Sequence, residues 1–202
     1  KYALSNLNEN DYFNIIQFES NFHEYSPQTI RATKENIAKA LKYIGKFEAN
    51  GGTEAKPALV QAMRKVSSEE AVSTVLFLTD GDVGNENDIV RAVKANLGNA
   101  RLFAVAIGSA PNSHLLNKVS KFGRGTFTYI SSLDEVESKM KLLFEKIEKP
   151  VLTDVQLKID DAEIYPKPIP DLFIGQPIVI FGKLNSSNSN FVVLEGRNNS
   201  GI

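Results

Sequence analysis

The stretch Thr74-Val-Leu-Phe-Leu-Thr-Asp-Gly-Asp82 decides the fold of this chain. Its first six residues are apolar or β-branched without interruption, which is typical of a central parallel strand that is buried on both faces. A turn that carries two carboxylates follows directly. The sequence therefore predicts a buried strand that delivers acidic side chains to one edge of a sheet.

Outward from this strand, strand-like and helix-like segments alternate until about Pro150. Because helices separate most of the strands, the predicted fold class is α/β with a doubly wound, mainly parallel sheet. The short link Glu19 to Asn21 leaves room only for an antiparallel edge strand, Phe22 to Tyr25. We expect the other strands to share one sheet, and they are Tyr12 to Phe18, Thr74 to Thr79, Arg101 to Ile107 and Thr126 to Ile130.

Ligands of such sheets bind at the carboxyl ends of the strands, where the connecting loops meet. Three loops in these positions are polar or rich in glycine, namely Asn50 to Thr53, Thr79 to Asp82 and Gly108 to Pro111. They are the candidate functional loops of the chain.

Charge and composition exclude several functions. Lys and Arg number 23 against 24 Asp and Glu, so no net field favours nucleic acid. The absence of cysteine excludes disulfide scaffolds, thiolate zinc sites and cysteine nucleophiles. The longest apolar runs, such as Val75 to Leu78, are far shorter than the roughly 20 residues of a membrane-spanning helix, so none is predicted.

Three ordered motifs carry a resemblance to a known family, and they are Asn10 to Phe18, Gly51-Gly-Thr-Glu54 with Pro57-Ala-Leu59, and Leu76 to Gly81. Over roughly residues 1 to 150 the chain resembles a von Willebrand factor type A domain, in the variety of inter-alpha-trypsin inhibitor heavy chains and their bacterial relatives. The resemblance implies a Rossmann-like sheet with a metal-ion-dependent adhesion site (MIDAS). There an Asp-x-Ser-x-Ser motif, a threonine and an aspartate bind Mg²⁺ or Mn²⁺.

By motif, Thr53 matches the metal-binding threonine and Asp80 the aspartate. Asp82 has two interpretations, a solvated turn residue or a residue that assists the metal through a bound water. No Asp-x-Ser-x-Ser occurs in the chain. Lys1 to Leu7 reads as the end of a helix, and the family places the motif just before that helix. We therefore expect a domain that is incomplete at its N-terminus, lacks its first central strand and binds the metal weakly or not at all as it stands.

The pattern changes at Pro150. Alternating apolar residues and clustered prolines and asparagines from there predict antiparallel β-structure. We expect residues 1–149 to be the type A-like domain and residues 150–202 to be part of a β-sandwich-like domain, because so short a tail buries little core of its own.

Alternative sites are weaker. The loop from Asp80 to Arg91 has no glycine at the sixth position and no glutamate at the twelfth, which rejects an EF-hand. His23 and His114 have no other ligand types at metal spacing and are interpreted as surface residues. A strand that runs into Asp80 and Asp82 also resembles a haloacid-dehalogenase-type phosphatase, with one aspartate as nucleophile and the other as proton shuttle.

The preferred hypothesis is a non-enzymatic recognition and adhesion module, extracellular, at the cell surface or periplasmic, without catalytic residues. The resemblance implies a protein partner that is bound through an acidic group. A missing central strand would leave strand edges unpaired. We expect that gap to be closed, either by approach of the two flanking strands, by the β-tail, or by a strand swapped from another copy in an oligomer.

Overall fold

The computed structural model describes residues 1–47, 52–65, 73–80, 83–109, 111–148, 150–185 and 191–198. Its α-helices are α1 (Tyr2–Ser5), α2 (Lys34–Ile44), α3 (Ala55–Arg64), α4 (Glu86–Asn96), α5 (Ser113–Phe122) and α6 (Val136–Glu148), with a 3₁₀ helix, η1 (Leu133–Glu135), before α6. The strands of the first part are β1 (Tyr12–Phe13), β2 (Ile16–Phe18), β3 (Phe22–Glu24), β4 (Ile30–Arg31), β5 (Thr74–Thr79), β6 (Arg101–Ile107) and β7 (Arg124–Ile130). Those of the last part are β8 (Pro150–Ile159), β9 (Ala162–Tyr165), β10 (Leu172–Phe173), β11 (Phe181–Leu184) and β12 (Val192–Arg197).

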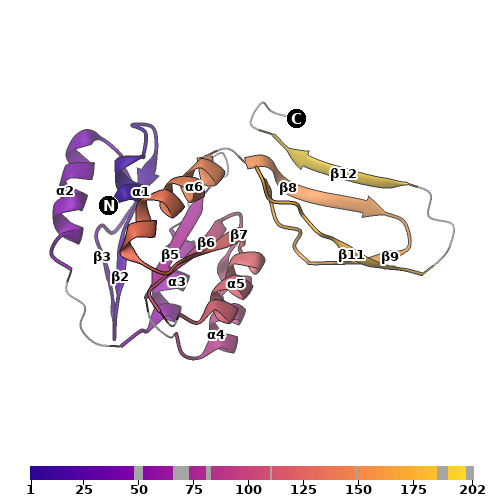
Figure 1. Ribbon diagram of the computed structural model, residues 1–202, viewed down its shortest axis with the longest axis horizontal. Coiled ribbons are helices and arrows are strands. Elements are labelled where there is room, and N and C mark those ends of the chain that lie inside the picture. Colours follow the sequence, from indigo (N-terminus) through magenta and orange to yellow (C-terminus); the bar gives the residue numbers. More distant parts are fainter. Residues whose placement is uncertain are drawn as a thin grey trace.

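A parallel sheet of order β5-β6-β7 forms the centre of the α/β unit, which we define as residues 1–148. The middle strand, β6, is buried along almost its whole length, as its apolar sequence predicts. Its residues Leu102, Ala104 and Ala106 pack against α3, α4 and α5. Phe103 and Val105 point to the opposite face and pack against α6. Helices on both faces confirm the predicted doubly wound α/β fold (Figure 1).

The N-terminal strands form two further small sheets, β1-β4 and β2-β3. The hairpin β2-β3 is antiparallel with Gln17 opposite His23, as predicted. Thr33 caps α2 by accepting a hydrogen bond from Asn36 N at 3.2 Å. α1, β1 and α2 enclose a separate apolar cluster around Phe13 and Ala40.

The prediction of one sheet is wrong in two respects. The predicted strand Tyr12 to Phe18 is interrupted, because Asn14 Nδ2 donates to Ser26 O at 2.8 Å and Asn14 Oδ1 accepts from Ser26 N at 3.2 Å, in place of a backbone ladder. In addition, β2 pairs only with β3, and β5 only with β6, among the residues that the structure describes. The ring centroids of Phe18 and Phe77 lie 5.6 Å apart, so side chains, not ladder hydrogen bonds, join the two strands.

The expected closure of the gap within the chain is therefore also wrong. Over the described ranges, β2 and β5 do not pair with each other, and no strand after Pro150 pairs with either. A strand supplied by a second copy stays a prediction.

The β-segment, residues 150–198, is antiparallel, as predicted. β8 lies between β10 and β12, while β9 pairs with β11. Figure 1 shows β8, β9, β11 and β12 as an elongated ribbon that projects from the α/β unit on the side opposite α2. Within the described residues, no helix has the length and apolar character needed to cross a bilayer.

Candidate functional site

The loops that follow β5 and β6 meet at one edge of the parallel sheet. Thr79 is in register with Ala106, so both strands end at the same level. A Cβ atom added to Gly108 would lie 3.7 Å from the carbonyl oxygen of Asp80, and Gly108 has a φ of +106°. Glycine is required at this position because other residues rarely adopt that conformation. The exposed Asp80 side chain therefore stands at the carboxyl edge, where the sequence places it.

Thr53 reaches the same edge from the loop before α3. Gly52 N donates to Ser20 Oγ at 3.2 Å, and Glu54 N donates to Glu19 O at 2.7 Å. These two bonds fix the loop to the turn after β2, so Thr53 between them is half-buried and held in place. Neither Ser20 nor Glu19 carries a sequence signal for this role, because the contact joins residues far apart in the chain.

A pocket of about 490 Å³ opens beside Thr53. It lies between the beginnings of α3 and α4, and its lining residues are Thr53, Glu54, Ala55, Lys56, Pro57, Gly84, Asn85, Asp88 and Ile89. Thr53 and Asp80 thus both border the connection from β5 to α4. Thr53 lines the pocket together with Gly84 and Asn85 of this connection. Asp80 is the first residue of the connection. The structure brings the two predicted site residues to one edge, while Asp82 lies outside the described residues.

Asp88 is an acidic residue of this pocket to which the sequence motifs assign no role. Its carboxylate bonds Arg91, and Lys56 Nζ lies 4.0 Å from Asp88 Oδ2. The hydrogen bond from Arg91 and the charge of Lys56 lower the pKa of Asp88. Asp88 is therefore ionised and engaged by cations at neutral pH.

A side-chain bridge joins the beginnings of α4 and α5 at the same edge. Asn112 Nδ2 donates to Glu86 Oε1 at 2.6 Å, and Asn112 Oδ1 accepts from Leu115 N at 3.0 Å as the cap of α5. The only signal in the sequence is the preference for asparagine at a helix N-cap. His23 and His114 are exposed, as expected.

The donors at this edge suit a hard cation in kind but not in number. Thr53 offers a hydroxyl oxygen and Asp80 a carboxylate, which are ligands that Mg²⁺ prefers. Among the described residues, no group of three or more His, Cys, Asp or Glu side chains is arranged to hold a metal ion. Two such donors are too few for a complete metal site within the described part of the chain.

Comparison with known proteins agrees with this arrangement. The sequence profile of the von Willebrand factor type A domain matches residues 1–129. Inter-alpha-trypsin inhibitor heavy chain H2 of Sus scrofa is 28% identical over 201 residues, covering 92% of this chain and 22% of that protein. The chain spans about a quarter or less of the length of the curated relatives it matches, from 23% down to 9%.

Solved structures show the same fold. A von Willebrand factor type A protein from Catenulispora acidiphila superposes with a TM-score of 0.71 at 22% identity, covering 96% of this chain and 48% of that one. Proximal thread matrix protein 1 of the mussel byssus, solved with a zinc-occupied MIDAS motif, has a TM-score of 0.50 at 17% identity over 69% of this chain and 37% of its own. These likenesses give no support to the phosphatase alternative.

Proposed function

The chain belongs to the von Willebrand factor type A family, and on that premise we propose that it is a non-enzymatic recognition module whose complete form binds a protein partner through a divalent cation. Domains of this family are generally protein-interaction modules. The observation that carries the proposal is the placement of Thr53 and Asp80. Both border the connection after β5, at the carboxyl edge of the parallel sheet.

Thr53 and Asp80 are the proposed metal ligands of this chain, and Mg²⁺ or Mn²⁺ the proposed ions. One neutral hydroxyl and one carboxylate give a reluctantly dehydrated cation little advantage over bulk water. Because the chain has no Asp-x-Ser-x-Ser motif, we expect it to bind the ion weakly or not at all by itself. With the motif in place, the cation would keep an open position for an acidic group of the partner.

The wider setting belongs to the same proposal. A recognition role of this kind fits an extracellular, cell-surface or periplasmic protein. Residues 1–149 are the proposed recognition domain, and residues 150–202 the proposed part of a β-sandwich-like domain. Within the described ranges no strand pairs with the edge of β5 that faces away from β6, which supports association through a strand from a second copy.

Titration calorimetry with Mg²⁺ and Mn²⁺ tests the metal site. We compare the chain with a chimera in which the Asp-x-Ser-x-Ser strand of a family member is fused ahead of Lys1. The chimera should bind at micromolar concentration and the chain should not. Binding should be lost with Asp80→Ala or Thr53→Ala and retained with Asp160→Ala, a matched exposed aspartate in the distant turn after β8.

Two results would contradict the assignment. Micromolar binding by the chain alone would show that other residues form the ligand set. Binding by the chimera that survives both Asp80→Ala and Thr53→Ala would place the site elsewhere.

A further inference from the structure

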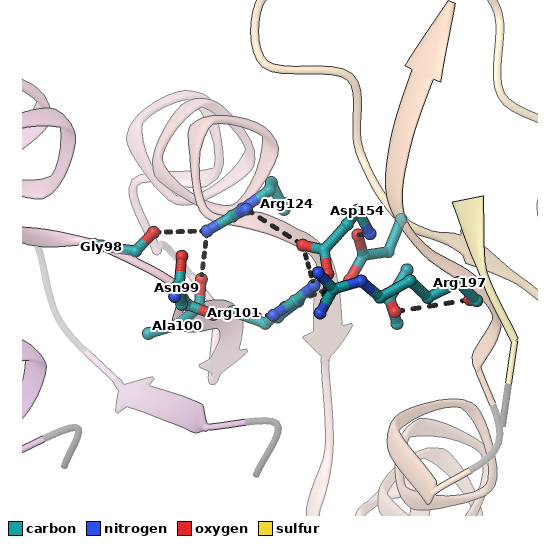
Figure 2. A network of polar contacts seen from close by, with 9 residues as sticks. Gly98, Asn99, Ala100, Arg101, Arg124, Asp154 and Arg197 are labelled. Atoms are coloured by element: carbon teal, nitrogen blue, oxygen red, sulfur yellow. Dashed lines mark hydrogen bonds and ion pairs between the residues drawn. The ribbon is translucent and has the colours of Figure 1, made fainter. Parts of the chain in front are cut away.

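A buried ionic network lies at the amino end of β6 (Figure 2). This end is opposite the carboxyl edge of the sheet, where Thr53 and Asp80 lie and which we call the candidate metal edge. Arg101, the first residue of β6, is only 4% exposed. Its Nε donates to Asp171 Oδ2 at 2.6 Å, its Nη2 to Asp154 Oδ1 at 2.8 Å and its Nη1 to Asn99 O at 2.7 Å. All three nitrogens of the guanidinium therefore have an acceptor.

Both acidic partners of Arg101 come from the β-segment. Asp154 lies in β8, and Asp171, which is 3% exposed, precedes β10. The second oxygen of Asp171 accepts from Asp154 N at 3.0 Å. The network thus bridges the α/β unit and the β-segment, and its central pair, Arg101 and Asp171, has almost no access to water, while Asp154 is partly exposed.

A second arginine joins from the neighbouring strand. Arg124, the first residue of β7, places Nη1 3.7 Å from Asp154 Oδ1, and its Nη2 donates to Ala100 O at 3.3 Å. Arg124 and Asp154 have φ values of +58° and +52°, a conformation that residues other than glycine rarely adopt. Their backbone is held in an uncommon state at the place where their side chains meet.

An aromatic contact accompanies the charges. Phe173, two residues after Asp171, is 4% exposed, and its ring centroid lies 5.5 Å from that of Phe103 at an interplanar angle of 68°. Phe173 belongs to the same apolar cluster as Met140 and Leu143 of α6. The segment 169–173 therefore contributes side chains to the core of the α/β unit.

Separation of the two parts would be unfavourable for two reasons. It would leave Arg101 without its anionic partners, or Asp171 without its cation, in surroundings built to exclude water. It would also expose the rings of Phe103 and Phe173. A buried pair is weakly screened by salt, in contrast to the exposed Lys158–Glu195 pair on the β-segment itself.

We infer that residues 169–173 are a docking segment, with Asp171 and Phe173 as its anchors, that fixes the β-segment rigidly to the base of the α/β unit. The two parts then move as one body. β6 has 7 residues, and at about 3.3 Å per residue it spans about 20 Å between the docking segment and the candidate metal edge. The β-segment and that edge are thereby presented to partners in one fixed orientation. This inference does not depend on metal binding.

Pulsed electron-spin distance measurements test the rigidity in the full chain. The chain contains no cysteine, so Lys121→Cys in α5 and Lys183→Cys in β11 introduce unique positions for spin labels on the two parts. We expect one narrow distance distribution. It should be the same at about 0.1 M and about 1 M salt, although the Debye length falls from about 10 Å to about 3 Å.

Asp171→Asn and Phe173→Ala in the labelled chain should each broaden the distribution. Glu195→Gln, which removes only the exposed pair with Lys158, should leave it narrow. A broad distance distribution in the labelled chain without further substitutions would overturn the inference. Broadening of that distribution at high salt would overturn it too. A distribution that stays narrow in both anchor variants would overturn it as well.

Discussion

Arg101 is a cation at the start of a core strand, a place where arginine is rarely buried. Burial alone would lower the pKa of Arg101, but the hydrogen bonds and charges of Asp171 and Asp154 raise it overall. The guanidinium is therefore charged at every pH at which the protein is folded. The contribution of Arg101 to stability is best measured by replacing Arg101 and leaving Asp154 and Asp171 unchanged.

Arg101→Met should reduce the free energy of unfolding by about 3–5 kcal/mol, because Asp171 is left buried without its cation. Lys158→Met is the control, since it removes a cation from an exposed pair and should cost about 0–1 kcal/mol. Urea unfolding followed by circular dichroism gives both values. Equal losses in the two variants would show that the network at Arg101 does not stabilise the fold more than a surface pair does.

Glu135 is a second residue whose charge depends on its neighbours. The Ser-x-x-Glu spacing of Ser132 and Glu135 predicts a capping box for the last helix. In the structure it is Ser131 whose N and Oγ donate to Glu135 Oε2, at 2.9 and 2.7 Å. Hydrogen bonds from Lys139 and Ser131 lower the pKa of Glu135 from 4.5 to about 2. The folded state thus favours the ionised carboxylate.

This depressed pKa predicts a pH dependence of stability. Stability from Glu135 is fully present above the unfolded pKa of 4.5 and is lost as the pH falls toward the folded value of about 2. Glu135→Gln should therefore flatten the acid limb of the unfolding free energy in that window. Glu137→Gln, which changes an exposed residue in the first turn of α6, is the control and should leave the slope unchanged. Urea titrations at a series of pH values test this, and equal slopes for Glu135→Gln and the original chain would contradict it.

At the scale of elements, β5 lies at one edge of the parallel sheet, where another strand could form hydrogen bonds with it. It pairs on one edge with β6, and over the described residues its other edge has no ladder. Leu78 of this strand is 42% exposed although its neighbours Phe77 and Thr79 are buried. An open apolar edge of this kind favours association.

We expect the chain to be oligomeric in light scattering coupled to size exclusion. Leu78→Lys should shift it toward the monomer, because a charge on an edge strand opposes pairing with another copy. Leu142→Lys, which changes an exposed leucine on α6, is the matched control and should have no effect. A monodisperse monomer before any substitution would contradict the proposed strand exchange.

Much of the element pattern could be predicted from the sequence, because it depends on local apolar runs. β5 and β6 have the predicted bounds for this reason. The break in the first strand could not be predicted, since it depends on Asn14 bonding Ser26 across twelve positions. Pairing partners also could not be predicted: the sequence indicates that β2 and β5 are strands, but not that, over the described residues, the two strands remain in separate sheets.

The same distinction holds for the site. Thr53 and Asp80 could be proposed as site residues from the sequence, because they belong to motifs in the loop before α3 and in the loop after β5. Asp88 and Asn112 could not, because their importance depends on where the beginnings of α4 and α5 meet. The docking segment was equally hidden, since Asp171 gains its partner from a strand 70 positions earlier.

At the scale of the whole molecule, β6 connects two ends with different tasks. Its carboxyl end opens on the loops that bear the proposed metal ligands, and its amino end carries the ionic network that holds the β-segment. The proposed metal ligands and the contacts that hold the β-segment thus lie at opposite ends of the same strand. The central claim concerns the first of these ends, namely that Thr53 and Asp80 bind the cation through which a partner is recognised.

An anomalous difference map from crystals of the Asp-x-Ser-x-Ser chimera grown with Mn²⁺ tests that claim most directly. The account predicts one strong peak at the carboxyl edge of the sheet, bound by Thr53 Oγ1 and by the Asp80 carboxylate, each directly or through one water. It also predicts that the peak disappears in crystals of the chimera with Asp80→Ala. A strong peak bound by neither residue, or a carboxyl edge without any peak in the unsubstituted chimera, would contradict the account.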